Sequence, residues 1–190
     1  MLEIILYTLL FLTGVIALAA SLLIGSSFIA MLFTKVPFVP TPKKNVKIIV
    51  DQLGLKPGQK FYDLGCGDGR FLIEAEKQGA KALGFEISPW AFFRAKIKIL
   101  LYKSKVKVLY KNFYHENLAG ADAVFCFLID TIMPKVEKKL KEELKPGAKI
   151  ACYGFKLPTW KPEKVIDLKP SDKRSSHIYL YQKSEIRNQK

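Results

Sequence analysis

Residues 61–70 read FYDLGCGDGR, and this run constrains the fold more than any other part of the chain. It predicts a buried strand, a loop with three alternating glycines and a helix over residues 70–78. The glycines are Gly65, Gly67 and Gly69. Glycine lets a backbone pass close to a ligand because it lacks a Cβ and tolerates positive φ. The helix that follows directs free N–H groups toward the same place. Such a loop at the carboxyl end of the first strand of an α/β sheet is typical of a nucleotide-type cofactor site.

The glycine spacing and a nearby acid narrow the choice of cofactor. In the dinucleotide fingerprint G-x-G-x-x-G the third glycine comes one residue later than it does here. Asp63 lies two residues before the first glycine. That carboxylate would repel a pyrophosphate, whereas it would attract the amino group of S-adenosylmethionine. The pattern resembles motif I of the class I S-adenosylmethionine-dependent methyltransferases, which implies that Asp63 and the three glycines bind this cofactor.

Two later positions support the same cofactor. Glu86 ends a predicted strand over residues 81–86 and lies 17 residues past the last loop glycine. A separation of about 20 residues is expected for an acid that accepts the hydroxyl protons of a ribose. After a predicted strand over residues 106–110, Asn112 and Phe113 stand where class I methyltransferases contact the adenine. The alternatives are a solvated glutamate at a strand end and an ordinary loop asparagine.

The rest of the chain alternates apolar runs with amphipathic stretches, as a doubly wound α/β sheet requires. Further strands are predicted over residues 121–128, 148–153, 164–168 and 177–181, and helices over residues 43–55, 88–102 and 134–144. The last two strands are expected to form a hairpin around a polar loop at residues 170–176. The inner face of the first of these helices is expected to carry Ile48, Ile49, Leu53 and Leu55. The predicted fold is thus a Rossmann-like, seven-stranded class I methyltransferase sheet.

Residues 4–34 contain no charged side chain, and such a run is long enough to cross a bilayer. A cleaved signal peptide is the alternative, with Ala-Leu-Ala at residues 17–19 as a candidate cleavage box. However, the usual basic amino-terminal region is missing, and the apolar run continues well past that stretch. The run is followed by Lys35, Lys43, Lys44 and Lys47. The positive-inside rule therefore places the amino terminus outside and the globular domain in the cytosol. The expected organisation is a transmembrane anchor at residues 1–34, a proline-rich linker at 35–42 and a methyltransferase domain at 43–190.

The net charge of +14 comes from 31 basic and 17 acidic side chains. A surface this basic attracts anionic lipids, acidic proteins or nucleic acid. For a tethered domain, an anionic lipid surface is the simplest partner. One basic cluster lies on and after the helix at 88–102, and we interpret it as a solvated face rather than a partner site. Its members are Arg94, Lys96, Lys98, Lys103 and Lys105. The three separate cysteines indicate a reducing compartment, and no metal site is expected.

Two further stretches extend the resemblance to one branch of these enzymes. Residues 84–90 read GFEISPW and residues 157–162 read LPTWKP. With the glycine loop, they resemble the small membrane-anchored adenine nucleotide translocase and ATP synthase c-subunit lysine methyltransferases. The resemblance implies N-methylation of a lysine in a membrane protein, with S-adenosylmethionine as methyl donor. Asn112 departs from the aspartate that is common at its position. The target protein and the oligomeric state are left open.

The target lysine must be neutral to attack a methyl group, so a dry, partly apolar site is expected around it. Candidates near the carboxyl ends of predicted strands are Tyr114, Asp130, Tyr153 and Trp160. Core packing is the alternative for the aromatic residues, and a plain surface position is the alternative for Asp130. Among other functions, RNA or DNA methylation is disfavoured, because residues 127–130 read FLID instead of the Asn/Asp-Pro-Pro-Tyr motif that clamps a planar amine. Methylation of a lipid or quinone is compatible with the anchor, and the intact loop disfavours a non-catalytic module.

Overall fold

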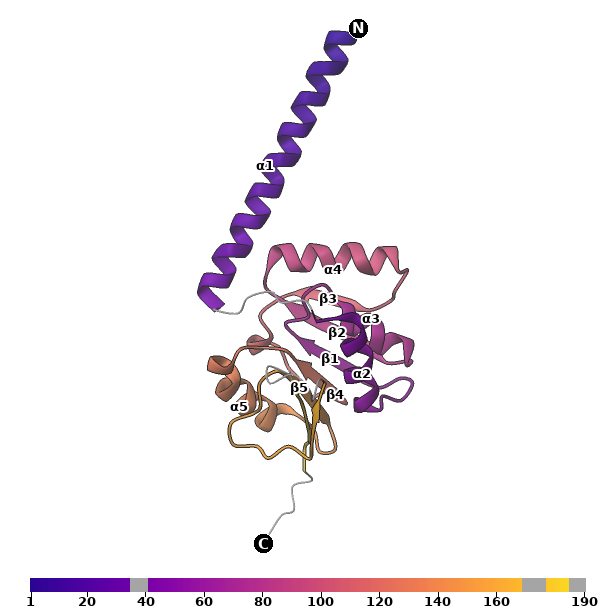
Figure 1. Cartoon of the computed structure of the whole chain (residues 1–190), viewed down its shortest axis with the longest axis vertical. Helices are drawn as coiled ribbons and strands as arrows, with labels where there is room; N and C mark the ends of the chain where they lie inside the picture. The colour runs from indigo at the N-terminus through magenta and orange to yellow at the C-terminus, as the bar shows by residue number, and fades with distance from the viewer. Residues whose placement is uncertain (35–40, 169–176, 185–190) are drawn as a thin grey trace.

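The computed structural model describes residues 1–34, 41–168 and 177–184 (Figure 1). Within these residues, seven strands form one sheet in the order β3-β2-β1-β4-β5-β7-β6. Their bounds are β1 Lys60–Leu64, β2 Lys81–Glu86, β3 Lys107–Tyr110, β4 Ala123–Cys126, β5 Lys149–Tyr153, β6 Lys164–Asp167 and β7 His177–Gln182. Strands β1 to β5 are parallel, whereas β7 is antiparallel to both β5 and β6. The predicted seven-stranded α/β sheet is confirmed.

Strand β4 is shorter than the predicted strand over residues 121–128. Its pairing with β1 and with β5 covers only Ala123–Cys126. Ala121 and Leu128 are buried, but they belong to the turns at either end of the strand. The apolar run therefore predicted the buried residues correctly, but it overestimated the length of the strand, because residues beyond its hydrogen-bonded part are buried too.

Helices cover both faces of the sheet. The helices are α1 Leu2–Thr34, α2 Lys43–Leu53, α3 Arg70–Lys77, α4 Pro89–Leu101 and α5 Met133–Glu143, with short 3₁₀ turns at Phe113–His115 and Asp130–Ile132. Side chains of α2, α3 and α4 pack into one hydrophobic cluster, and those of α5 pack into the other. Ser88 begins α4 as predicted, because its side-chain oxygen accepts a hydrogen bond from the N–H of Ala91.

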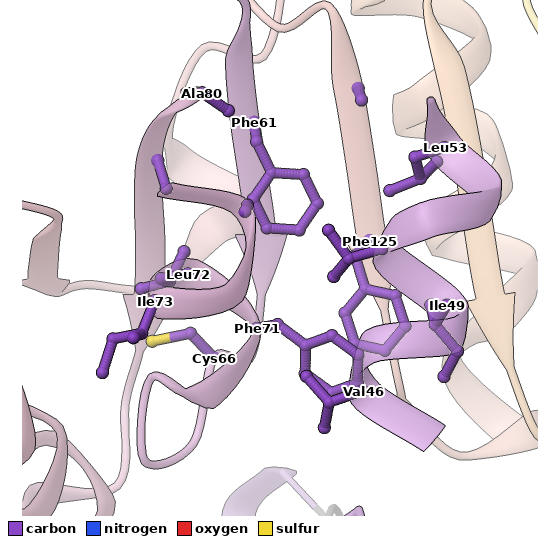
Figure 2. Close-up of a cluster of buried hydrophobic side chains, with 14 of the residues drawn as sticks. Val46, Ile49, Leu53, Phe61, Cys66, Phe71, Leu72, Ile73, Ala80 and Phe125 are labelled. Carbon is purple, nitrogen blue, oxygen red and sulfur yellow. The ribbon is translucent and has the colours of Figure 1, made fainter. Parts of the chain in front are cut away.

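The cluster beneath α2 and α3 fixes the position of the glycine loop (Figure 2). Phe71 of α3 stacks on Phe125 of β4 with 3.9 Å between the ring centroids. Val46 and Ile49 of α2 lie against the same pair of rings in Figure 2. Because α3 begins where the loop ends, burial of Phe71 holds the loop at the edge of the sheet.

The inner face of α2 differs from the prediction at one position. Ile49, Leu53 and Leu55 are buried as expected, whereas Ile48 is exposed. Val46 and Val50 are buried in its place. The i, i+3, i+4, i+7 spacing from Val46 selects one continuous stripe, and Ile48 lies outside that stripe.

Helix α1 extends away from the domain (Figure 1), and its side chains over residues 2–26 are largely exposed. Among the described residues it is the one helix whose length and composition would allow it to cross a membrane, over Leu2–Ser26. Most of the predicted proline-rich linker, residues 35–40, and the whole of the predicted 170–176 loop lie outside the described residues. The hairpin of β6 and β7 on either side of that loop is confirmed.

Candidate active site

The loop between β1 and α3 has the backbone that its glycines predict. Gly65, Gly67 and Gly69 have φ values of 83°, 55° and 75°, all in the left-handed region. The N–H groups of Gly65 and Cys66 both donate to the carbonyl oxygen of Phe85, each at 2.9 Å. The loop therefore curls over the carboxyl end of β2, and α3 begins directly after it.

Gly84 of β2 is a site residue that the sequence interpretation missed. A Cβ at this position would lie 2.6 Å from Cys66 Sγ and 2.7 Å from Leu72 Cδ1. Real Cβ contacts are not that short, so the loop can lie against β2 only because residue 84 is glycine. A glycine inside a predicted strand often marks a close approach of another segment, and this signal was available in the sequence.

Asp63, near the end of β1, carries a buried carboxylate, and the residue is 1% exposed. Among the residues that the structure describes, neither of its carboxylate oxygens has a hydrogen-bond partner. Burial, together with the negative charges of Glu86 and Asp68, raises the pKa of Asp63 well above its usual range. Buried polar groups are nearly always satisfied, so this carboxylate indicates a missing ligand or ordered water. A positively charged ligand nearby would offset the cost of its burial.

Glu86 stabilises the glycine loop through hydrogen bonds, and it also occupies the position where a ribose ligand was predicted. One carboxylate oxygen accepts the N–H of Gly67 at 2.8 Å, and the other accepts the N–H groups of Ile87 and Ser88 at 2.9 and 2.8 Å. Burial raises the pKa of Glu86, although these three hydrogen bonds oppose the shift. A carboxylate has about four acceptor positions, so one remains available for a hydroxyl. Its role as a ribose ligand stays a prediction.

Asp68 forms an ionic cluster at the far end of the loop, and the sequence interpretation did not single it out. Its carboxylate accepts from Arg70 Nε at 2.8 Å and from Arg70 Nη2 at 2.7 Å, and it also pairs with Lys98 of α4. Burial alone would raise the pKa of Asp68, but these two cations outweigh it and hold the pKa well below its usual range. Lys98 is therefore a structural partner of the loop, which corrects its assignment to a solvated face. Arg70 also donates to the carbonyl oxygen of Thr41, just before α2.

Asn112 and Phe113 lie at the same edge of the sheet, beyond β3. Glu86 is level with Tyr110 in the parallel ladder, and the N–H of Lys111 donates to the Glu86 carbonyl at 3.1 Å. Asn112 Oδ1 accepts the N–H of Tyr114 at 3.0 Å and so caps a 3₁₀ turn. Asn112 is exposed, whereas Phe113 is buried. Contact of either residue with an adenine stays a prediction.

The carboxyl ends of β4 and β5 lie beside the glycine loop. A Cβ at Gly65 would lie 3.2 Å from Leu128 Cδ2, just past β4. The ring of Phe127 lies 4.7 Å from that of Tyr153 at the end of β5, centroid to centroid. Asn45 of α2 donates from Nδ2 to the Tyr153 hydroxyl at 3.3 Å, although the two residues are 108 positions apart. A polar pair among aromatic rings therefore lies at this edge.

The other three substrate candidates have different surroundings. The Tyr114 hydroxyl is buried and has no hydrogen-bond partner among the described residues, and burial raises the pKa of Tyr114 to about 12. Lys135 Nζ lies 4.2 Å from the centroid of that ring. Asp130 is exposed and begins the 3₁₀ turn after β4. Trp160 packs against Tyr181, which pairs with Ile150 near the start of β5, so Trp160 lies away from the carboxyl edge.

The LPTWKP stretch is held against α5. Glu137 of α5 is buried, and its carboxylate accepts from both the N–H and the hydroxyl of Thr159. The N–H of Leu157 donates to the Tyr181 hydroxyl at 2.9 Å. These contacts fix the chain between β5 and β6, so in this structure the motif has a clear packing role.

Comparisons with known proteins agree on a family. Residues 63–164 match the ANTKMT methyltransferase domain. A protein-lysine N-methyltransferase of Saccharolobus islandicus is 34% identical over 151 residues, which cover 77% of this chain and 92% of that relative. The chain belongs to the ANTKMT methyltransferase family. The ATP synthase c-subunit lysine N-methyltransferase of Mus musculus is 32% identical over 157 residues, covering 80% of this chain and 63% of that relative. This chain thus spans less than two thirds of the mouse protein.

A solved structure supports the same conclusion for fold and cofactor. The RNA methyltransferase from Salinibacter ruber, in complex with S-adenosyl-L-homocysteine, superposes with a TM-score of 0.72 at 27% identity. The match covers 77% of this chain and 95% of that structure. This ANTKMT-family chain is an S-adenosylmethionine-dependent methyltransferase. Its loop suits that cofactor, because the buried carboxylate of Asp63, which has no hydrogen-bond partner among the described residues, adjoins three glycines with positive φ.

Proposed function

We propose that this enzyme transfers methyl groups to the ε-amino group of a lysine in a membrane protein. The observation that carries the proposal is the match to the Saccharolobus islandicus protein-lysine N-methyltransferase over 92% of that relative's length. A match of this extent includes the carboxyl ends of both halves of the sheet, where cofactor and substrate meet in an α/β fold. The mouse relative is named for a lysine in the ATP synthase c-subunit, and this supports the same acceptor chemistry.

We assign the cofactor to the first half of the sheet. Asp63 is proposed to face the cationic part of S-adenosylmethionine, and Glu86 its ribose. Asn112 and Phe113 are proposed to contact its adenine. The loop glycines would pass beneath the methionine portion. The bound cofactor supplies a methyl group activated by its sulfonium, so the protein's task is to position the acceptor amine and keep water away.

The acceptor amine is proposed to bind at the ends of β4 and β5. The Tyr153 oxygen accepts one hydrogen bond from Asn45 and keeps a lone pair for an N–H of the amine. The rings of Phe127 and Tyr153 make the site partly apolar, which favours the neutral, nucleophilic form of lysine. Tyr153 and Asn45 are thus proposed as positioning residues, with Asp130 as a contact at the rim.

RNA is the second candidate substrate, because the Salinibacter ruber structure is that of an RNA methyltransferase and this chain carries a net charge of +14. The segment after β4 argues against it. Residues 127–130 read FLID and lack the prolines and the terminal tyrosine of a planar-amine clamp. An apolar, largely exposed α1 also suits a membrane protein better than a nucleic acid as the target.

We propose that α1 anchors the enzyme in a membrane with its catalytic domain on the cytosolic side. Lys35, Lys43, Lys44 and Lys47 follow the apolar segment, whereas Glu3 is the one acidic or basic side chain before residue 35. This asymmetry is the basis of the proposed orientation. Protease digestion of intact and permeabilised cells would test it, because only a cytosolic domain is protected until the cells are opened.

A transfer assay tests the reaction. Purified full-length protein would be incubated with radiolabelled S-adenosylmethionine and with separated membrane, soluble, lipid and RNA fractions. We expect label on a membrane polypeptide, and methyl-lysine after acid hydrolysis. Asp63→Ala should abolish the label, and Tyr153→Phe with Asn45→Ala should reduce it while cofactor binding persists. Asp51→Asn, an exposed aspartate on α2, serves as the matched control. Label in RNA or in extractable lipid would replace the proposal with that substrate.

A further inference from the structure

Helix α4 is apolar on two faces: Phe92 and Ile99 pack partly against the core, whereas four other large apolar side chains point away from the domain. Ala91 and Ala95 are buried against the sheet. The outward positions hold four large apolar residues with exposures from 51% to 77%: Phe93, Ile97, Leu100 and Leu101. Their i, i+4, i+7, i+8 spacing makes one continuous stripe, which we call the outer stripe of α4. A contiguous apolar surface of this kind on a folded domain indicates an interaction site.

Positive charge surrounds the outer stripe. Lys96 is exposed and lies next to it on α4. Lys103 and Lys105 are exposed just past the end of the helix, where Lys103 has a φ of 52°. A helix with an apolar stripe and flanking lysines has the composition of one that lies in the plane of a membrane interface. Lysines at such positions can bury their carbon chains and still place the ammonium among anionic headgroups.

The position of α1 indicates that a lipid bilayer is the partner of the outer stripe of α4. Helix α1 lies in contact with α4, and Figure 1 shows α4 along the side of the domain from which α1 extends away. The end of α1 nearest the domain is where a membrane-spanning segment would leave the bilayer. A helix beside that point, with an apolar outer stripe and lysines around it, therefore meets the lipid surface.

We propose that the outer stripe of α4 inserts into the headgroup region of the membrane, with Lys96, Lys103 and Lys105 bound to anionic lipid. The inference rests on the proposed anchoring by α1. It also has a consequence for substrate choice. Helix α4 begins at Pro89, three residues after Glu86 at the carboxyl edge of the sheet, and Lys98 pairs with Asp68 in the glycine loop. The active-site edge is then held close to the bilayer surface, so the acceptor lysine lies near the membrane–water interface.

Fluorescence quenching of the full-length protein in vesicles tests this placement. The reporter is Leu100→Trp in a chain that also carries Trp90→Phe and Trp160→Phe. The matched control reporter is Lys138→Trp, at an exposed position of α5 in the same background. Vesicles would contain phosphatidylcholine with brominated acyl chains, with or without phosphatidylglycerol. We expect the reporter at position 100 to lose most of its emission in anionic vesicles, and the reporter at position 138 to keep its emission.

The contribution of the lysines is tested separately. Lys96→Gln, Lys103→Gln and Lys105→Gln together should restore much of the emission at position 100. The same change at Lys138, Lys145 and Lys156 should leave the quenching unchanged, and thermal melts would show that each variant folds. Equal quenching in vesicles without phosphatidylglycerol would overturn the assignment to anionic lipid.

Resistance of the protein to carbonate extraction separates the two proposals. If α1 resists extraction but the reporter at position 100 is not quenched, anchoring stands and the placement of α4 is wrong. If the protein is extracted, the anchoring proposal fails, and this inference fails with it. A reporter that emits at short wavelength without quenching, in a chain that cross-links to itself, would show that a second copy covers the outer stripe.

Discussion

The two ends of the glycine loop each hold a buried aspartate, but their surroundings differ. At the start, Asp63 has no hydrogen-bond partner among the described residues. At the end, Asp68 is paired with Arg70 and Lys98. The pKa of Asp63 is raised by burial and by neighbouring carboxylates, whereas the pKa of Asp68 is lowered despite its burial. A paired carboxylate joins parts of the fold, whereas an unpaired one costs stability unless a ligand completes it. We therefore assign Asp68 to the structure of the loop, and this contrast supports the proposed role of Asp63 at the cofactor.

The largest expected effect follows from removing the unpaired charge. Asp63→Asn should weaken S-adenosylmethionine binding by about 2–4 kcal/mol, because a buried charge that faces a cationic ligand is lost. The cofactor-free protein should be as stable as the wild type or more stable, since a desolvated charge is removed. Titration calorimetry and thermal melts would measure both quantities. Unchanged affinity with lowered stability would reverse the roles assigned to the two aspartates.

The paired aspartate should show the opposite pattern. Asp68→Asn is expected to lower the free energy of unfolding by about 2–3 kcal/mol, because Arg70 and Lys98 lose a buried partner. Cofactor affinity should fall less than in the Asp63 variant. Urea denaturation would measure the loss. Asp51→Asn, which removes an exposed pair with Lys47, should cost less than about 1 kcal/mol and serves as control.

A third change displaces the loop without altering either charge. Gly84→Ala should destabilise the protein by about 1–2 kcal/mol, because the new methyl group would overlap Cys66 and Leu72. Cofactor affinity should fall as well, since the loop can no longer lie against β2. Gly84→Ala should cost less stability in a Cys66→Gly background than in the wild type, because one of the two overlaps is then removed. If the losses of stability from the two changes were additive, residue 84 and Cys66 would not be in close contact.

The smallest expected effect is the dependence of stability on pH, and it has opposite signs for the two aspartates. The pKa of Asp63 is raised in the folded state. Its contribution to folding stability is therefore fully present below the unfolded-state pKa and is lost as pH rises through the folded-state pKa. The pKa of Asp68 is depressed, so its contribution is present above the unfolded pKa and is lost as pH falls through the folded value. Denaturation of both variants across the acidic range should test this. The free energy of unfolding of Asp63→Asn should increase relative to that of the wild type as pH rises. The loss of unfolding free energy in Asp68→Asn should become smaller as pH falls. Parallel pH profiles would refute this contrast.

The sequence predicted those parts of the site that depend on adjacent residues and missed those that depend on contacts between distant residues. The glycine loop, the strand that ends in Glu86 and the helix that starts at Ser88 were predicted correctly, because each depends on residues adjacent in sequence. The partnership of Asp68 with Lys98 was missed, because these residues are 30 positions apart and meet only when α4 packs against the glycine loop. Tyr153 was predicted as a candidate, but its partner Asn45 was not, because α2 reaches β5 only in the folded chain.

The amino-acid sequence by itself determined the order of strands and helices, the cofactor loop and the apolar segment before the domain. These follow from glycine spacing, hydrophobic periodicity and run length, which are local properties of a chain. The tertiary structure decided which carboxylate is paired and which is not, and which way α4 faces. Periodicity shows that α4 has two apolar stripes, but it cannot say which one meets the sheet. Helix α4 approaches the glycine loop closely where Ala95 lies against Gly69, and a small side chain is needed at that point. This packing leaves Phe93, Ile97, Leu100 and Leu101 on the outside.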